Sequence, residues 1–200
     1  MYKDIDEDNL VELAKVDVDA FGEIYLRYYD RMYNYVYYRT SNHNDAEDIV
    51  ERVFERAFKH IGRYENKGYP FSAWLYRIAR NLVANWHRDN SRRTILSLDD
   101  ITRWQVDPRD PPDIATELLE HRELLLEAIQ RLPADRQELL ILKFVEHESN
   151  ANIGQIMGRS EGAIKSLYHR TLRALRDEVD ELLKPEKPLS WWPLGRGRKR

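Results

Sequence analysis

Cationic and polar side chains share one face of a predicted helix in the segment IGQIMGRSEGAIKSLYHR, residues 153–170. On a helical wheel from residue 161 to 176, Ile164, Leu167 and Leu175 cluster on one side, and the opposite side is polar or basic. Such side chains can neutralise phosphates and hydrogen-bond to base edges, so the chemistry they favour is binding to duplex DNA. The candidate contacts are Arg159, Lys165, Ser166, His169, Arg170 and Arg173.

A tight turn separates this helix from a shorter helix with its own apolar face. The apolar residues from Ile153 to Met157 precede Gly158, and Arg159 and Ser160 follow before the second helix begins. Two short helices joined in this way can cover one core, as in a helix-turn-helix whose second helix enters the major groove. A helical hairpin with solvated basic residues explains the same pattern, since the motif is short and degenerate.

Arginines gather a second time between Trp74 and Arg93, where the acidic side chain of Asp89 alone opposes them. They create a local positive field although the whole chain has a net charge of -3. Cations beside aromatic rings can hold an opened nucleic-acid strand through phosphate contacts and base stacking. Core packing is the alternative for each ring, and it is favoured for Trp86, which lies on the apolar side of its helix. The aromatic residues at the start of this segment are Tyr64, Tyr69, Phe71, Trp74 and Tyr76.

The composition excludes several other kinds of site. There is no cysteine, which excludes disulfides, thiolate catalysis and cysteine-based zinc sites. The six histidines show no metal-ligand spacing and no phosphate-binding glycine loop is present, so we expect no metal, no cofactor and no enzymatic activity. The acidic N-terminus lacks a signal-peptide pattern, and no apolar window reaches the length of a membrane span. We therefore expect a soluble, cytoplasmic protein with no membrane partner.

The elements that must position these residues all have helical periods. Apolar residues recur at steps of three and four over residues 17–40, 45–61 and 73–88, and again in the last third of the chain. Asn44 is the expected N-cap of the second of these helices, because Glu47 stands three positions further on, as in a capping box.

The arrangement of these helices predicts an all-α fold. We expect two small helical domains, residues 1–93 and 114–184, joined by a flexible linker, with the helix-turn-helix in the second domain. Residues 94–113 are rich in Asp and Pro and have no sustained period, which is typical of a linker. Residues 185–200 form a basic tail that contains tryptophan.

Three segments, in their order and spacing, carry a resemblance to a known family. They are DAEDIVERVFERAF, FSAWLYRIARNLVANWHRDNSRR, and LPADRQELLILKFVEHESNANIGQIMGRSEGAIKSLYHRTLRAL. They resemble the core-polymerase-binding segment, the promoter −10 recognition and melting segment, and the −35-binding domain of bacterial sigma factors of the extracytoplasmic-function (ECF) type. The resemblance covers roughly residues 10–180.

This resemblance implies a sigma factor that binds core RNA polymerase and directs promoter-specific transcription initiation. It implies that the candidate duplex-DNA contacts read the −35 element, and that an anti-sigma factor is a further partner besides polymerase and promoter DNA. The residues it implies for the −10 element are Tyr64, Tyr69, Phe71, Trp74, Arg77, Arg80, Asn81 and Arg88. Those it implies for polymerase binding are Asp48, Ile49, Glu51, Arg52 and Glu55.

Two alternatives stay open. The charged face of the segment DAEDIVERVFERAF can equally be a solvated surface, the commoner fate of charged helix faces. A helix-turn-helix repressor that acts without polymerase would account for the second domain, although it leaves the resemblance of the first domain unexplained.

The chain departs from the family pattern at a few positions. Glu51 stands where the family usually has glutamine, and Gly154 stands where it usually has alanine. We expect Gly154 to weaken its helix by about 1 kcal/mol relative to alanine. In the tail, Trp191 and Trp192 precede four terminal cations, and we expect them to dock on a surface and regulate promoter binding. A disordered tail is the alternative.

Overall fold

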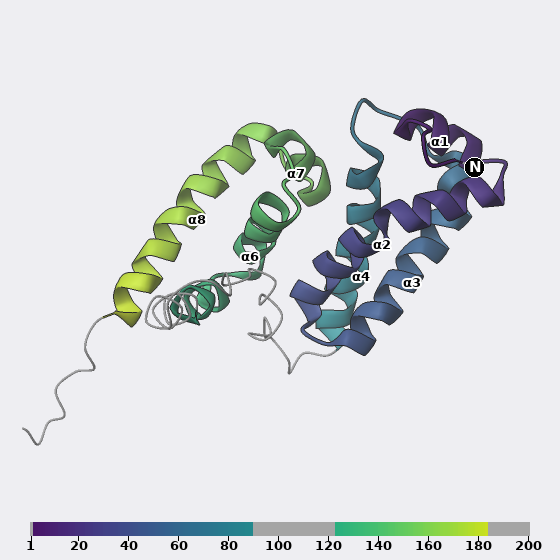
Figure 1. Cartoon of the computed structure of the whole chain (residues 1–200). Coiled ribbons are helices and arrows are strands. Elements are labelled where there is room, and N and C mark those ends of the chain that lie inside the picture. The colour runs from purple at the N-terminus through teal and green to yellow at the C-terminus, as the bar shows by residue number, and fades with distance from the viewer. Residues whose placement is uncertain (1, 90–122, 184–200) are drawn as a thin grey trace, which may run out of the picture.

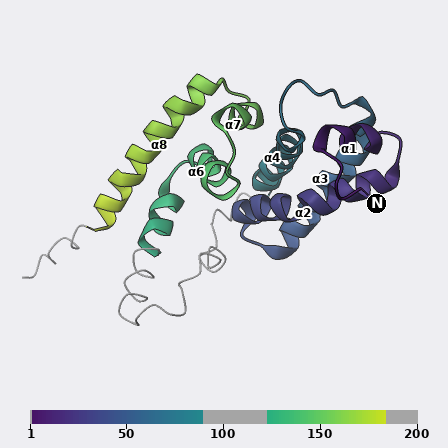
Figure 2. The ribbon, with the colours of Figure 1, turned by 45° about the horizontal axis from the view of Figure 1, so that its top comes forward.

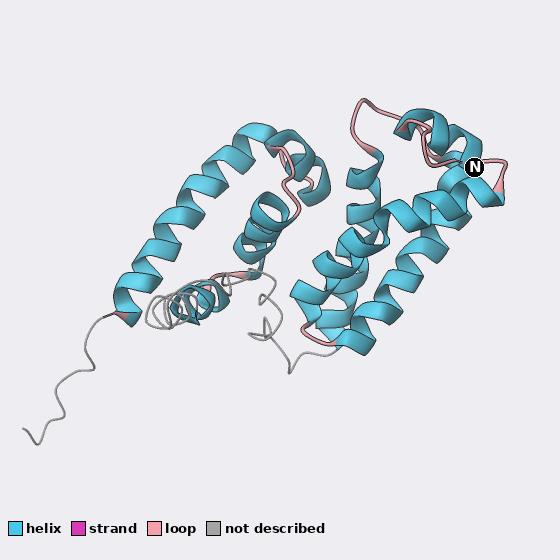
Figure 3. Ribbon diagram, viewed as in Figure 1, coloured by secondary structure: helices cyan, strands magenta, loops and turns pink. Residues whose placement is uncertain are grey.

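The regular structure of this protein is helical wherever the chain is described (Figure 3). A computed structural model describes residues 2–89 and 123–183. They form an N-terminal group of helices, residues 2–89, and a C-terminal group, residues 123–183 (Figure 1). The predicted all-α class with two helical domains is confirmed. The predicted linker, 94–113, and the predicted tail, 185–200, lie outside the described residues.

The N-terminal group is built around its longest helix. This helix, α2, packs against the other three α-helices of the group, and α3 also packs against α4. Its buried residues include Ile24, Met32 and Tyr35, each fully buried at helical spacing. The elements of this group are α1 (Glu7–Ala14), α2 (Val18–Thr40), α3 (His43–His60), the 3-10 helix η1 (Ile61–Arg63) and α4 (Phe71–Asp89).

The start of α3 differs from the sequence prediction. Its N-cap is Asn42, whose side chain accepts a hydrogen bond from the backbone N–H of Asp45 at 3.0 Å. The predicted cap, Asn44, lies inside the first turn, so that prediction is wrong. The reason is that Ser41, the C-cap that follows α2, has left-handed backbone, which leaves Asn42 as the extended residue that precedes the next helix.

The C-terminal group contains the predicted pair of helices joined by a tight turn, although the second helix, α8, has 22 residues and is longer than predicted. Ser149 and Ser160 cap α7 and α8 with their side-chain oxygens, and Gly158 ends α7 in the left-handed conformation at φ 67°. The group comprises helical residues 123–131, α6 (Ala134–Leu140), the π-helix η3 (Ile141–Val145), α7 (Asn150–Met157) and α8 (Glu161–Leu182).

A glycine allows the turn between α7 and α8 to fold back closely on α7. A Cβ atom added to Gly154 would lie 2.7 Å from the backbone carbonyl oxygen of Arg159. The same glycine that weakens α7 by propensity is therefore the residue that lets the turn approach it. This close approach fixes the direction in which α8 leaves the turn.

The two helical groups lie in contact. In both Figure 1 and Figure 2, α7 lies between α8 and α4 of the N-terminal group, and α7 packs against both helices. A single cluster of buried apolar side chains runs through both groups and includes Leu142 and Ile153 of the C-terminal group. Across residues 2–89 and 123–183, no helix combines the length and the apolar character that a membrane span requires.

We predict that Gly154→Ala destabilises the protein by about 1–3 kcal/mol, because the new methyl group meets backbone that cannot move without shifting the turn. Gly162→Ala is the matched control, since it adds a methyl group to a helical glycine with nothing within 4 Å. That control should be neutral or stabilising by up to about 1 kcal/mol. Urea unfolding of both variants measures the difference, and equal stabilities would contradict the role assigned to Gly154.

Candidate nucleic-acid interface

Helix α8 exposes the face that the sequence predicts for duplex DNA. Ile164, Leu167 and Thr171 are buried on its inner side. The outer side holds the exposed residues Lys165, Ser166, His169, Arg170 and Arg173. The structure thus places these five predicted residues together on one open surface. Whether they bind DNA stays a prediction.

Two cations of this surface are held by carboxylates that solvent reaches. The Nη2 atom of Arg159, in the turn, lies 3.1 Å from Oδ2 of Asp135. The Nζ atom of Lys165 lies 2.7 Å from Oε1 of Glu161. Ion pairs this exposed contribute at most about 1 kcal/mol each. A phosphate can therefore replace either carboxylate as the partner of the cation.

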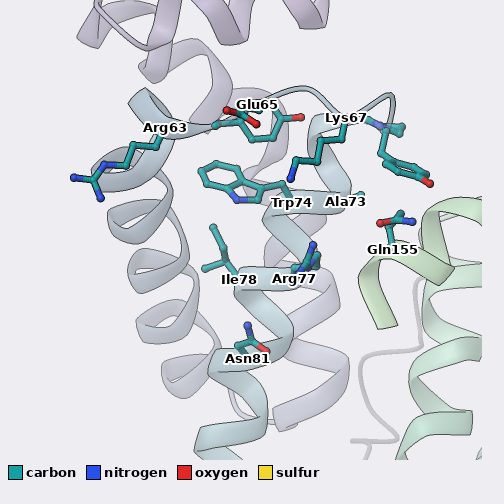
Figure 4. Close-up of a pocket in the computed structure, with 12 residues that line it drawn as sticks. Arg63, Glu65, Lys67, Ala73, Trp74, Arg77, Ile78, Asn81 and Gln155 are labelled. Carbon is teal, nitrogen blue, oxygen red and sulfur yellow. The ribbon is translucent and has the colours of Figure 1, made fainter. Parts of the chain in front are cut away.

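A hollow of about 420 Å³ opens beside the start of α4 (Figure 4). This volume falls within the range of small-molecule binding pockets. Five of the residues predicted for the −10 element lie in its lining, from both the loop before α4 and the helix itself. The lining consists of Arg63, Tyr64, Glu65, Lys67, Tyr69, Pro70, Ala73, Trp74, Arg77, Ile78, Asn81 and Gln155.

The aromatic wall of the hollow is supported from behind by a buried ring. Trp74 is half-buried, and its ring centroid lies 5.1 Å from that of Tyr64 and 5.3 Å from that of Phe71. Phe71 is 2% exposed. The structure therefore places Phe71 in the core, where it positions Tyr64 and Trp74 instead of facing a ligand. Tyr69 is 38% exposed and is the most accessible ring of the lining.

The cations predicted beside these rings fall into two classes. Arg77 and Arg88 are exposed and available to phosphates. Arg80 is half-buried, and its Nε atom donates to Glu138 of the C-terminal group at 3.0 Å. Lys67 and Arg63 line the hollow as well, so the hollow is a cationic site with an aromatic wall.

Burial shifts the pKa values of Tyr64 and His87. Burial, reinforced by the nearby carboxylates of Glu7 and Asp8, raises the pKa of Tyr64, so its hydroxyl stays uncharged beside an anionic ligand. Burial lowers the pKa of His87, and the charge of Arg39 adds to this effect. His87 is therefore biased toward its neutral form and adds little to the positive field of α4.

The charged face of α3 is open, with one exception. Asp48, Glu51, Arg52 and Glu55 are exposed. Ile49 is 2% exposed and belongs to the apolar cluster, so the structure places it in the core instead of on the predicted polymerase-binding surface. Ile49 lies four residues before Val53, which is about one helical turn, so the two side chains share one side of α3. This spacing is the sequence signal that could have revealed the burial of Ile49.

Gln155 is a lining residue that the sequence did not predict. It lies on α7, about 80 residues beyond the rest of the hollow, and reaches it because α7 packs against α4 (Figure 4). No local pattern in the sequence signals that contact. Among the described residues there is no cluster of His, Asp and Glu that could hold a metal ion.

Comparisons with known proteins agree with this arrangement. The model of Sigma-70 region 2 matches residues 24–93, and the model of Sigma-70 region 4 matches residues 122–175. The ECF RNA polymerase sigma factor SigW of Bacillus subtilis is 30% identical over 86% of this chain and 95% of its own length. The chain belongs to the ECF sigma factor family. By family it is a transcription-initiation protein.

Other relatives extend the comparison. BldN, an ECF RNA polymerase sigma factor of Streptomyces coelicolor, is 38% identical over 83% of this chain, which spans 63% of the length of BldN. CnrH, solved in complex with the cytosolic domain of CnrY, aligns with a TM-score of 0.64 at 19% identity, over 88% of this chain and 97% of that one. RpoE of Bartonella quintana, solved with the anti-sigma factor NepR, aligns with a TM-score of 0.58 at 24% identity, over 84% and 98%. These two structures share the fold.

We predict that Arg173→Ala weakens binding to duplex DNA and lowers the slope of log Kobs against log salt concentration by about 1, because one phosphate contact is lost. Arg176→Ala is the matched control on the same helix, since Arg176 is exposed and lies 3.7 Å from Asp180. Fluorescence anisotropy with labelled duplex across salt concentrations measures both slopes. Equal slopes for the two variants would contradict the placement of the DNA on this face.

Proposed function

We propose that this sigma factor binds core RNA polymerase and directs promoter-specific initiation by reading a −35 duplex and melting a −10 element. One arrangement carries the proposal: an exposed basic helix-turn-helix surface and a cationic hollow with an aromatic wall occur in one chain. The first suits intact duplex, and the second suits an opened strand. The function needs both activities, and it places the protein in the cytoplasm with polymerase and promoter DNA as partners.

In this proposal α8 enters the major groove of the −35 element. The helix is braced by α7 and aimed by the close turn at Gly154. Lys165 and Ser166 lie near its N-terminal end, from which side chains reach base edges, and Arg173 lies further along, where it meets a phosphate. Arg159, His169 and Arg170 complete the contact surface.

The hollow beside α4 captures an unstacked base of the −10 element. Tyr69 and Trp74 offer ring faces for stacking, which contributes roughly 1–3 kcal/mol per base. Asn81 can hydrogen-bond to a base edge, while Arg77 and Arg88 neutralise the strand's phosphates. Phe71 acts by holding Tyr64 and Trp74 in position.

The exposed face of α3 is the proposed docking surface for core polymerase. Asp48, Glu51 and Glu55 surround Arg52 on this face, so it fits a partner surface that is mainly basic. Ile49 is buried and contributes by packing α3 against the core. An anti-sigma factor is a further proposed partner, since RpoE, a structural relative, was solved with one.

Reconstituted transcription tests the function directly. We expect core polymerase with this protein to initiate at discrete sites on a promoter library, and core polymerase alone to give uniform background. Run-off products mapped by sequencing measure the difference. Identical products with and without the protein would contradict the proposal, and DNA binding at full strength without polymerase would favour a repressor.

We predict that Tyr69→Ala impairs melting of the −10 element, because a stacking face worth roughly 1–3 kcal/mol, or about 5- to 150-fold in the opening equilibrium, is removed. Tyr25→Ala is the matched control, since Tyr25 is similarly exposed at 36% and does not line the hollow. Permanganate reactivity of promoter thymines in the holoenzyme complex measures opening. Normal reactivity in the Tyr69→Ala holoenzyme would remove this ring from the proposed site.

A further inference from the structure

The carboxylate of Glu7 connects three helices at the point where α4 begins. Glu7 lies in the first turn of α1, and its Oε1 atom accepts a hydrogen bond from the backbone N–H of Phe71 at 2.7 Å. Its Oε2 atom accepts a hydrogen bond from the hydroxyl of Tyr28 on α2. Phe71 is the first residue of α4. One side chain of α1 therefore holds α2 and the start of α4 together.

This contact supplies an acceptor that the start of α4 needs. The first N–H groups of an α-helix have no carbonyl partner within the helix, and a negative charge beside them is favourable. A residue next to the helix in sequence commonly provides such an acceptor, whereas Glu7 lies 64 positions from Phe71. The position of the first turn of α4 thus depends on where α1 lies.

The segment before α1 fixes the position of Glu7. Arg27 of α2 donates from Nη1 to the carbonyl oxygen of Ile5 at 2.8 Å and from Nη2 to that of Tyr2 at 2.7 Å. Asp6 then caps α1 with its side chain. The first turn of α1 is therefore attached to α2 on its N-terminal side, which orients Glu7 toward α4.

A second carboxylate of α1 holds the loop that precedes α4. This loop, residues 64–70, runs past α1 to the start of α4 (Figure 1). The side-chain amide of Asn66 donates to Oδ1 of Asp8 at 2.8 Å. The amide oxygen of Asn66 accepts from the N–H of Gly68 at 2.8 Å, and Gly68 has left-handed backbone at φ 79°. The turn in the middle of the loop is thus attached to α1.

The two attachments enclose the part of the loop that lines the hollow. Lys67 and Tyr69 lie in sequence between Asn66 and Phe71, and both line the hollow. Trp74 follows in the first turn of α4 and lines the hollow as well. A shift of the loop or of the first turn of α4 would therefore change the spacing between the rings of Tyr69 and Trp74.

Phe71 transmits the contact to the aromatic wall by packing. Its ring centroid lies 5.9 Å from that of Tyr28, 5.1 Å from that of Tyr64 and 5.3 Å from that of Trp74. Glu7 binds both the backbone of Phe71 and the hydroxyl of Tyr28. Burial, with the hydrogen bond to Glu7, raises the pKa of Tyr28, so its hydroxyl keeps the proton that it donates.

We propose that Glu7 is a positioning residue for strand opening: together with Asp8, it holds the rings of Tyr69 and Trp74 at the spacing that an unstacked base requires. Glu7 itself contacts no DNA, and the inference rests on the function proposed for the hollow. Ordering a loop costs conformational entropy, and a loop that is ordered beforehand does not lose that entropy when a ligand enters. Without Glu7, the ordering of the loop opposes capture of the base.

The test variant is Glu7→Ala, with two controls on the same helix. Glu12→Ala removes the same charge from an exposed residue whose partner, Lys15, lies 2.6 Å away. Val11→Ala removes buried side-chain atoms and leaves the carboxylate of Glu7 unchanged, so it reports the effect of lost stability alone. Glu7→Gln is the conservative variant, since it keeps the length of the side chain and one acceptor oxygen.

Amide hydrogen exchange in the full-length protein measures the attachment without DNA. We expect the Phe71 amide to exchange about tenfold faster in Glu7→Ala than in the wild type, because a hydrogen bond to a charged acceptor is lost. Glu12→Ala should leave this rate unchanged. Exchange of the single amide is followed by NMR.

Permanganate reactivity of promoter thymines measures opening at saturating holoenzyme, on promoters selected from the library and at a temperature at which circular dichroism shows each variant folded. We expect the opening equilibrium to fall about tenfold in Glu7→Ala and to recover in Glu7→Gln. Binding of the closed promoter duplex should stay unchanged, because the surface of α8 is intact. Glu12→Ala and Val11→Ala should open promoters as the wild type does.

A second variant covers the case in which Glu7→Ala does not fold. Asp8→Ala releases only the middle of the loop, and both Asp8 and Asn66 are exposed, so the core is unaffected. It should lower the opening equilibrium by about two- to threefold, since one exposed hydrogen bond is lost.

Three results would overturn the proposal: an unchanged exchange rate or normal opening in a folded Glu7→Ala protein, opening in Val11→Ala that is as poor as in Glu7→Ala, or normal opening in Asp8→Ala where Glu7→Ala is unfolded. A failure of the proposed function is visible separately. In that case the wild-type holoenzyme itself opens no promoter, and the role of Glu7 in opening fails with it.

Discussion

The pairing of buried charges between the two helical groups is the interaction on which this conformation depends. Glu138 cannot stay buried without the donors of Tyr35, Arg39 and Arg80, so its environment sets where α6 lies against α2 and α4. The packing of α7 on α4, with Gln155 at the hollow, is part of the same contact between the two groups. Burial of apolar side chains supplies most of the stabilisation, while the charges select one register.

On the helices that carry a candidate binding face, the helical period places the core residues on one side and the candidate binding residues on the other. On α8, Ile164 and Leu167 face the core, which leaves the cationic residues in solvent without any further device. On α3 the same division leaves Asp48, Glu51 and Glu55 exposed. Exposing the two candidate binding faces therefore removes no apolar side chain from the core, because a helix that buries one side exposes the opposite side.

Several site predictions depended on the exact direction of a side chain, and there the sequence was less reliable. Ile49 and Phe71 lie in the core, because each occupies the inner side of its helix, next to the buried residues Val50 and Ser72. The predicted cap at Asn44 was wrong because the end of α2 sets where α3 can begin. Gly154, which helix propensity alone marks as a weakness, is required by the carbonyl of Arg159.

The sequence by itself determined the all-α class, the two helical groups, the helix-turn-helix and the polar face of α8, since these follow from local periods and turn residues that no distant contact overrides. It also indicated the aromatic and cationic segments through their composition. Only the tertiary structure decided that Arg80 pairs with Glu138, that Gln155 reaches the hollow, and that Arg31 meets Glu146 and Glu148. The Arg80–Glu138 contact joins residues 58 positions apart and the Arg31–Glu148 contact joins residues 117 positions apart, and so long a separation in sequence leaves no local pattern from which such contacts could be predicted.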